Sequence, residues 1–283
     1  MRKYFRMMIN YLVNKIAGKK EWQRFFERLH QASLMGMNFG NVDIESNGEK
    51  EVIKYVASHI GKDVNSVIFD VGANVGDYSK EVFSVLGENT RLHCFEPSKK
   101  AFGLLGENLK NYQNVKLYNI GFGEENKTAV LHSGQSGSGL GSLYARKLDH
   151  HGITMYEQEE VAIRRLDDFC RENNVEHIHL LKIDVEGNEL NVLRGAEKTI
   201  KSGAVGFIQF EFGGTDIDSK FFFKDFFDFL NPNYKIYRIL KDGIRLIDIY
   251  KEEYEIFLAI NYLAVSRTLY AKHITNRSVE MRK

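Results

Sequence analysis

Carboxylate side chains stand at the ends of two apolar segments in the second half of the chain. Asp184 ends the segment His179–Asp184, Glu186 follows two residues later, and Glu211 ends the segment Val205–Glu211. Residues two apart in a strand point to the same face, so we expect Asp184 and Glu186 to act together. Such carboxylates can take a proton from a hydroxyl nucleophile or bind a divalent cation. They can equally cap the next helix or bind loop N–H groups.

A turn that contains two glycines follows the apolar segment Ser66–Val71. Gly72 and Gly76 let the backbone turn sharply and approach a ligand closely, and the helix that follows would present free N–H groups to an anion. Asp70, just before the turn, suits a ligand that also carries a cation. A carboxylate and an ammonium on one small group describe an amino-acid end, such as that of S-adenosylmethionine. The candidate cofactor-binding residues of this turn are Asp70, Gly72, Ala73, Asn74 and Gly76.

The spacing of this turn argues against a dinucleotide. The dinucleotide fingerprint is G-x-G-x-x-G, whereas the turn is G-x-x-x-G with Asp70 two residues before it. An acidic side chain at that point would repel a pyrophosphate. A nicotinamide-dependent oxidoreductase is therefore the less favoured enzyme class, and a tight turn without a ligand is the remaining alternative.

A second acidic residue follows the next apolar segment, Arg91–Phe95. Glu96 lies 26 residues after Asp70, and an acid at this point can accept both hydroxyls of a ribose. Pro97 fits the first turn of a helix, so Glu96 could instead complement the helix dipole. After the third segment, Val115–Asn119, a base could lie against the backbone at Gly121, although a plain loop fits equally well. Glu96, Pro97 and Gly121 complete the candidate cofactor site.

Alternating apolar and helical segments position these residues. The predicted strands are Ser66–Val71, Arg91–Phe95, Val115–Asn119, His179–Asp184, Val205–Glu211, Lys235–Leu240 and Ile256–Ser266, and the predicted helices are Asp77–Leu86, Ser98–Asn108, Leu190–Lys201 and Asp218–Leu230. The first five strands are near-continuous apolar runs, which is typical of parallel strands covered on both faces. The pattern predicts an α/β fold with an open, mostly parallel sheet. The last two strands can pair antiparallel. Ligands bind such sheets at the carboxyl ends of the strands.

The motifs together resemble the FkbM family of S-adenosylmethionine-dependent methyltransferases, from about Leu34 to Ser266. The matching stretches are Phe69–Gly76, Phe95–Ser98, Arg165–Phe169, Leu181–Glu189, Phe210–Gly213 and Asn261–Ala264. The resemblance implies a class I methyltransferase fold, with a Rossmann-like sheet of seven strands, helices on both faces and the last strand antiparallel. It also implies methyl transfer from S-adenosylmethionine, most often to a hydroxyl of a sugar, polysaccharide or natural product.

The expected reaction is therefore O-methylation of a sugar or glycan-like acceptor by a single displacement, for which alignment of the acceptor oxygen matters most. Asp184, Glu186 and Glu211 are the candidate catalytic carboxylates. Mg²⁺ bound by the same three residues is an alternative, but no His/Cys cluster has the spacing of a transition-metal site, and we expect no metal. A non-catalytic protein that keeps the fold and docks through its basic ends is the alternative outside the enzymes.

Two further segments have open interpretations. The Gly/Ser-rich stretch 133–144, followed by His150 and His151, is either a solvated loop or a lid over the acceptor. In the segment Phe221–Leu230, the spacing of Phe222, Phe226 and Phe229 predicts a core-facing side, whereas Phe221, Phe223 or Phe227 could reach the surface and meet a partner or a lipid-linked acceptor.

The charge is balanced overall but unevenly placed. The chain has 39 basic and 38 acidic residues, so it lacks the basic excess of a polyanion-binding protein and we expect no nucleic-acid partner. Residues 1–30 hold eight basic and two acidic residues, beside apolar residues at helical spacing. Two amphipathic helices packed on the core are one interpretation, and peripheral docking on an anionic membrane is the other.

The remaining expectations concern location and domains. Cys94 and Cys170 cannot form a disulfide framework, which favours a reducing, cytoplasmic compartment. No run of about 18 apolar residues predicts a membrane span. We expect a helical extension over residues 1–62, a methyltransferase domain over 63–267 and a basic tail over 268–283. The sequence leaves the oligomeric state open.

Overall fold

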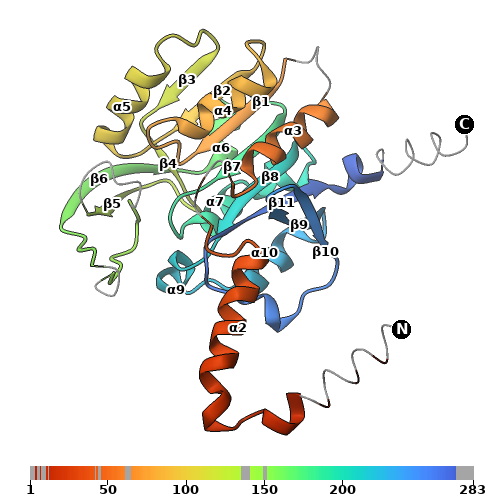
Figure 1. The fold of residues 1–283 in the computed structure, drawn as a ribbon. Helices are drawn as coiled ribbons and strands as arrows, with labels where there is room; N and C mark the ends of the chain where they lie inside the picture. The colour runs from red at the N-terminus through yellow and green to blue at the C-terminus, as the bar shows by residue number, and fades with distance from the viewer. Residues whose placement is uncertain are drawn as a thin grey trace, which may run out of the picture.

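The computed structural model describes residues 13–41, 43, 46–60, 65–134, 141–148 and 152–271, together with Tyr4, Met7 and Tyr11. Among these residues, the main β-sheet has eight strands (Figure 1). In spatial order the strands are β10 (Gly243–Ile247), β9 (Tyr234–Leu240), β11 (Ile260–Ser266), β8 (Val205–Phe212), β7 (Ile178–Ile183), β1 (Val67–Val71), β2 (Arg91–Phe95) and β3 (Val115–Tyr118). The sheet contains all seven predicted strands and adds β10 at one edge.

The directions of the strands follow the expected pattern. From β8 through β7, β1 and β2 to β3, neighbouring strands are parallel. β11 is antiparallel to both β8 and β9, and β10 is antiparallel to β9. The carboxyl ends of β1, β2, β7 and β8 therefore meet at one edge, where the predicted functional residues lie.

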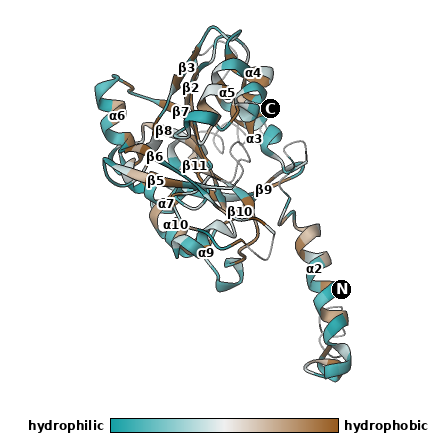
Figure 2. Cartoon of the chain, turned by 90° about the vertical axis from the view of Figure 1, so that its left-hand side faces the viewer, coloured by the Kyte–Doolittle hydropathy of each residue, from teal (hydrophilic) through white to brown (hydrophobic). Residues whose placement is uncertain are grey.

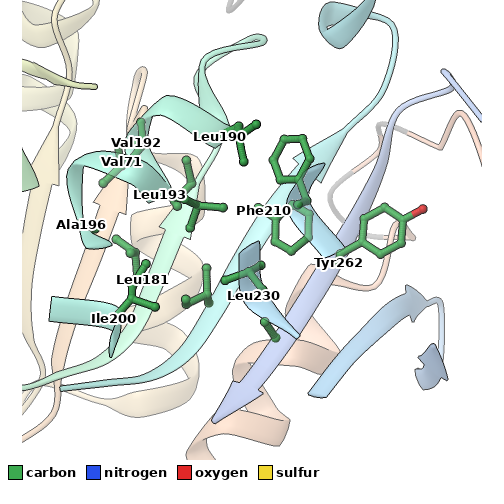
Figure 3. Packing of buried hydrophobic residues seen from close by; sticks show 14 of the residues in the cluster. Val71, Leu181, Leu190, Val192, Leu193, Ala196, Ile200, Phe210, Leu230 and Tyr262 are labelled. Carbon is green, nitrogen blue, oxygen red and sulfur yellow. The ribbon is translucent and has the colours of Figure 1, made fainter. Parts of the chain in front are cut away.

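Helices cover both faces of this sheet. One face carries α3 (Glu49–Ile60), α4 (Asp77–Leu86) and α5 (Lys99–Leu109), and the other carries α6 (Leu166–Glu172), α7 (Glu189–Gly195), α8 (Glu197–Lys201) and α10 (Phe223–Leu230). α9 (Thr215–Ser219) follows β8, and the short helices η1 (Lys20–Trp22) and η3 (Glu252–Tyr254) lie in connections. Figure 3 shows part of the core between α7, α8 and the sheet, where Leu181 and Leu193 are fully buried. Because both faces of the sheet are covered, β1 is apolar except for Asp70, and β7 is apolar except for His179 and Lys182.

Two predicted helices are each divided. The predicted helix Leu190–Lys201 is α7 followed by α8, because the carboxylate of Asp167 accepts the N–H groups of Lys198 and Thr199 and starts a new helix there. The predicted helix Asp218–Leu230 is α9 followed by α10. Lys220 has a left-handed φ of 62°, and the break leaves Phe222 as the N-cap of α10.

This break corrects the predicted phenylalanine faces. Phe222 is 52% exposed, whereas Phe223 and Phe227 are buried. The predicted helical periodicity runs through Phe222, which precedes α10, and it therefore places Phe222 in the core and Phe223 on a possible surface. Phe226 is fully buried, as predicted.

A second sheet lies outside the predicted pattern. β4 (Gly121–Phe122), β6 (Glu157–Arg164) and β5 (Lys127–Ser133) form it, with β4 parallel and β5 antiparallel to β6. Its central strand β6 alternates exposed residues with buried or half-buried ones, as expected for a sheet with one face toward solvent. It brings Gly121 and Ser133 to the same side as the carboxyl end of β2.

The N-terminal helix α2 (Gln23–Gly36) projects from the body (Figure 1). Phe25 and Leu29 are 50% and 53% exposed, and Leu34 is the buried residue of the helix. The prediction that the second amphipathic helix packs on the core is therefore wrong: among the described residues of α2, Leu34 lies in the core, and the rest of the helix extends away from the body. The apolar positions predicted at Phe5, Met8, Ile9 and Leu12 fall outside the described residues. Within the described part of the chain, no helix is long and apolar enough to cross a membrane.

Candidate functional site

The turn after β1 passes directly over the end of β7. Gly72 has a left-handed φ of 81°, and a Cβ there would lie 1.8 Å from the carbonyl oxygen of Asp184, so only glycine fits. The N–H groups of Gly72 and Ala73 both donate to the carbonyl of Phe95, at 2.9 and 3.0 Å. The turn is thereby fixed to both neighbouring strands, which brings the loops after β1, β2 and β7 together.

Glu96 is held at the end of β2 by two backbone hydrogen bonds. Its Oε2 accepts from the N–H of Asn74 at 2.9 Å, and its Oε1 accepts from the N–H of Ser98 at 2.8 Å. Burial raises the pKa of Glu96 to about 6, although both hydrogen bonds oppose this. A carboxylate has about four lone-pair sites, so each oxygen can still accept a hydroxyl.

A cavity lies between these loops and the small sheet. The predicted residues that line it are Gly72, Asn74, Glu96, Pro97, Gly121, Asp184 and Glu186. Its apolar lining, which the sequence did not predict, comes from Val71, Ala101, Phe122, Leu131, Leu143 and Ile163. The cavity thus combines an acid that suits a ribose with an apolar wall that suits a flat base, which are the two parts of an adenosyl group.

Three predicted cofactor-binding residues do not line this cavity. The carboxylate of Asp70 is fully buried on the α4 side of the sheet, where it accepts a hydrogen bond from the Ser79 hydroxyl at 2.7 Å. Ala73 is buried in the same core, and Gly76 is the N-cap of α4. They shape the turn rather than face the cavity.

The structure brings the three predicted catalytic carboxylates together. Ligand oxygens of Asp184, Glu186 and Glu211 all lie within 4.8 Å of one another. The physical reason differs from the predicted one, because β7 ends at Ile183 and Glu186 has a left-handed φ of 55°. The turn is braced by Glu189, whose carboxylate accepts the N–H groups of Val185 and Gly187.

The electrostatics of this cluster favour bound protons or bound cations. Burial, followed by the charge of Asp184, raises the pKa of Glu186 and holds that of Glu211 well above its usual range. Two cations oppose the effect: Lys182 Nζ lies 3.2 Å from Asp184 Oδ2, and Arg146 Nη1 lies 3.1 Å from Glu186 Oε2. The cluster can therefore orient a hydroxyl and accept its proton.

Lys182 was missed by the sequence analysis. Its side chain is 5% exposed, and its Nζ lies 3.4 Å from Asp70 Oδ1 and 5.1 Å from the ring centroid of Tyr78. The available signal was a lone lysine inside a strand that is otherwise apolar and predicted to be covered on both faces. Such a lysine must have a buried acidic partner.

A second missed contribution comes from α3. Glu49 Oε1 accepts a hydrogen bond from the Gln209 amide at 2.8 Å, and Gln209 in turn accepts one from the Tyr78 hydroxyl at 3.0 Å. Burial raises the pKa of Glu49, against the nearby charge of Lys182. The polar network therefore extends from the acceptor side of the site through the sheet to α3.

The segment 141–148 lies across the acceptor side. Gly141 and Leu143 line the cavity, and the Ser142 hydroxyl donates to the carbonyl of Glu186 at 2.6 Å. Arg146, 9% exposed, also contacts Asp218 Oδ2 at 3.2 Å. Of the stretch predicted as a loop or lid, residues 135–140 and the following His150 and His151 lie outside the described residues.

Comparison with known proteins identifies the family to which this cavity and its surrounding fold belong. The family model of the methyltransferase FkbM domain matches residues 70–239. The chain belongs to the FkbM methyltransferase family. The expected family, class I methyltransferase fold and cofactor are thus confirmed: the domain is an S-adenosylmethionine-dependent methyltransferase domain, and the nicotinamide alternative is not supported.

Several curated proteins match about half of this chain. Methyltransferase 1 of Beauveria bassiana is 32% identical over 47% of this chain and 59% of its own length. 2-O-methyltransferase NoeI of Sinorhizobium fredii is 29% identical over 47% and 58%, and hexuronic acid methyltransferase AglP of Haloferax volcanii is 25% identical over 55% and 59%. The chain therefore spans about 59% of the length of these relatives.

Solved structures are more distant. Aeropyrum pernix fibrillarin, crystallised with natively bound S-adenosylmethionine, is 13% identical with a TM-score of 0.42, over 77% of this chain and 76% of its own.

Proposed function

We propose that this FkbM methyltransferase transfers a methyl group from S-adenosylmethionine to a hydroxyl of a sugar or glycan-like acceptor. The observation that carries the proposal is that Glu96 and the carboxylate pair Asp184 and Glu186 line one cavity. A ribose-binding acid and a proton acceptor that line the same space are what a single displacement between cofactor and hydroxyl requires.

The residues on the β1 and β2 side would hold the cofactor. Gly72, Asn74, Glu96, Pro97 and Gly121 line the cavity, with Glu96 placed to accept the ribose hydroxyls and the apolar wall placed to cover the base. Asp70, Ala73 and Gly76 would act by fixing the turn. When bound, S-adenosylmethionine supplies a methyl group on a positively charged sulfur.

The residues on the β7 and β8 side would handle the acceptor. A sugar hydroxyl is a weak nucleophile, so it gains from a carboxylate that accepts its proton as the new bond forms. Asp184 is the best placed, because it lines the cavity and already contacts Lys182. Glu186 and Glu211 would orient neighbouring hydroxyls of the acceptor.

Two relatives support a sugar hydroxyl as the acceptor. One is named a 2-O-methyltransferase and another a hexuronic acid methyltransferase. A hexuronic acid offers both hydroxyls and a carboxylate, and the acidic cluster of this protein would repel the carboxylate. We therefore favour an ether-forming reaction over ester formation.

Alkaline hydrolysis of the labelled product tests this choice. The protein would be incubated with S-adenosylmethionine labelled in its methyl group and a panel of neutral and uronic-acid glycans. A methyl ether keeps its label in alkali, whereas a methyl ester releases it as methanol. Alkali-stable label in glycan is expected. Label released as methanol, or no transfer to any glycan, would contradict the proposal.

We also propose that the reaction takes place in the cytoplasm. Cys94 and Cys170 are both buried and unpaired, which fits a reducing compartment.

A further inference from the structure

α2 carries an apolar face that the described part of the protein leaves uncovered. Trp22, which is the N-cap of α2, and Phe25 and Leu29 within the helix are spaced three and four residues apart and are 37%, 50% and 53% exposed. We call these three residues the α2 face. Figure 2 shows α2 extending away from the body, with hydrophobic segments along it. A continuous apolar stripe on a helix is normally buried against a partner.

Basic side chains flank this face. Residues 13–36 hold five basic residues and two acidic ones. Arg24 and Arg28 lie about one helical turn apart. Arg24 precedes Phe25 and Arg28 precedes Leu29, so each arginine is turned about 100° around the helix axis from the apolar residue that follows it. The ion pairs found among the described residues include neither arginine. Arginines beside an apolar stripe can bury their aliphatic stems and keep their charges at an anionic surface.

The foot of α2 is fixed beside the acceptor side of the site. The Gly40 N–H donates to the carbonyl of Ala259 at 2.8 Å. Ala259 in turn packs on Gly213, where a Cβ would lie 2.7 Å from its Cα. Gly213 follows Glu211 by two residues at the end of β8. α2 therefore projects from the edge of the sheet that carries the candidate catalytic carboxylates.

Further exposed apolar side chains surround this edge. Ile217 of α9, Phe222 before α10 and Leu258 beside Ala259 are 59%, 52% and 41% exposed. We call these three residues the mouth rim. α9 and α2 both lie in the lower half of the molecule in Figure 1, and Figure 2 shows α9 at the lower left and α2 on the right.

We propose that the α2 face and the mouth rim dock this protein on an anionic phospholipid surface. Association with a second copy through the α2 face would bring the basic residues of both copies together, whereas anionic headgroups would neutralise them. If the proposed function is correct, a glycan acceptor carried by that membrane would present its hydroxyls close to Glu211. This second part rests on the proposed function, and the docking itself does not.

Vesicle flotation of the full chain tests the docking. One set of vesicles contains phosphatidylcholine alone, and the other contains equal parts phosphatidylcholine and phosphatidylglycerol. We expect the protein to float with the mixed vesicles and to stay in the bottom fraction with phosphatidylcholine alone. Raising the salt concentration should release it, because the attraction between cations and headgroups is screened.

Two double variants separate the contributions. Phe25→Ser with Leu29→Ser removes the apolar face, and Arg24→Gln with Arg28→Gln removes two charges; each should weaken binding to mixed vesicles about tenfold or more. The matched control is Leu104→Ser with Val130→Ser, which changes two apolar residues of similar exposure (44% and 40%) elsewhere on the molecule. The control should float like the unchanged protein.

The outcomes are distinct. Equal flotation of the Phe25/Leu29 variant and the control would overturn the proposal, as would failure of the unchanged protein to float. A protein that stays at the bottom and sediments as a dimer, but becomes a monomer in the Phe25/Leu29 variant, would show that the face binds a second copy instead. Binding of S-adenosylhomocysteine by the same variants reports on the proposed function separately, and none of these substitutions should change it.

Discussion

The ammonium group of Lys182 lies 3.2 Å from the carboxylate of Asp184, with the lysine side chain 5% exposed. The same ammonium lies 3.4 Å from Asp70. Lys182 thus connects the turn that shapes the cofactor side of the cavity with the carboxylate proposed to accept a proton. Without it, the acidic cluster would have to bind protons to relieve its own repulsion.

Replacing Lys182 with methionine removes the charge and keeps the length of the side chain. We expect the rate of methyl transfer to fall about a hundredfold and the acid limb of its pH profile to move to higher pH, because the carboxylates lose the cation that favours their ionised forms. Leaving the buried carboxylate of Asp70 without its cation should also cost about 3–5 kcal/mol of stability, measurable by urea unfolding. Lys182→Arg is the matched variant and should keep the pH profile. An unmoved profile in the methionine variant would contradict this role.

Asp184→Asn separates proton acceptance from cofactor binding. The asparagine keeps the shape of the side chain but cannot accept a proton, so kcat should fall about a hundredfold or more. The affinity for S-adenosylhomocysteine, measured by calorimetry, should change much less. Glu107→Gln, an exposed acid on α5 (75% exposed), is the control. Unchanged turnover in the Asp184 variant would remove it as the base.

Chelation tests the magnesium alternative. The three carboxylates are close enough to hold a cation, but Lys182 and Arg146 already supply positive charge to two of them. We therefore expect dialysis against EDTA to leave the rate of methyl transfer unchanged. Loss of activity that added Mg²⁺ restores would show that the cluster is a metal site.

The sequence predicts local features of the fold better than contacts between residues that are far apart in the chain. The strand Arg91–Phe95 and the helix Asp77–Leu86 have the predicted bounds, because the apolar pattern of the strand and the glycines on either side of the helix act locally. The convergence of Asp184, Glu186 and Glu211 was also predictable, since the ends of parallel strands meet at one edge.

The features that were missed depend on contacts between distant segments. Glu49 and Gln209 are 160 residues apart in the sequence, and no local pattern pairs them. The break between α7 and α8 depends on Asp167 from α6. For α2, the amphipathic pattern identifies an apolar face but does not say what covers it.

Truncation tests whether α3 belongs to the methyltransferase domain. A chain that begins at Met37 lacks α2 and should still bind S-adenosylhomocysteine and unfold cooperatively. A chain that begins at Asp63, the predicted domain boundary, also lacks Val52, Ile53 and Val56, which are at most 1% exposed. Losing three such side chains removes about 5 kcal/mol or more, comparable with the whole stability of a domain. Normal binding by the shorter chain would show that residues 1–62 are a separable extension.

The proposed role of Glu96 has a pH dependence with a defined sign. The ionised carboxylate is the form that accepts two ribose hydroxyls, and its pKa is raised to about 6. Affinity for S-adenosylhomocysteine should therefore be full above this pKa and should fall as the pH drops below it, by up to about tenfold per pH unit. In Glu96→Gln, the affinity should be lower at neutral pH and nearly independent of pH. Parallel pH dependence in both proteins would assign the effect to another group.

Calorimetric titration with S-adenosylhomocysteine near neutral pH tests the central claim most directly, with NAD as the competing ligand and Glu96→Ala beside the unchanged protein. We expect S-adenosylhomocysteine to bind, NAD not to bind, and the Glu96→Ala variant to bind S-adenosylhomocysteine much more weakly. If S-adenosylhomocysteine did not bind, or if NAD bound in preference to it, the cavity would not be an S-adenosylmethionine site.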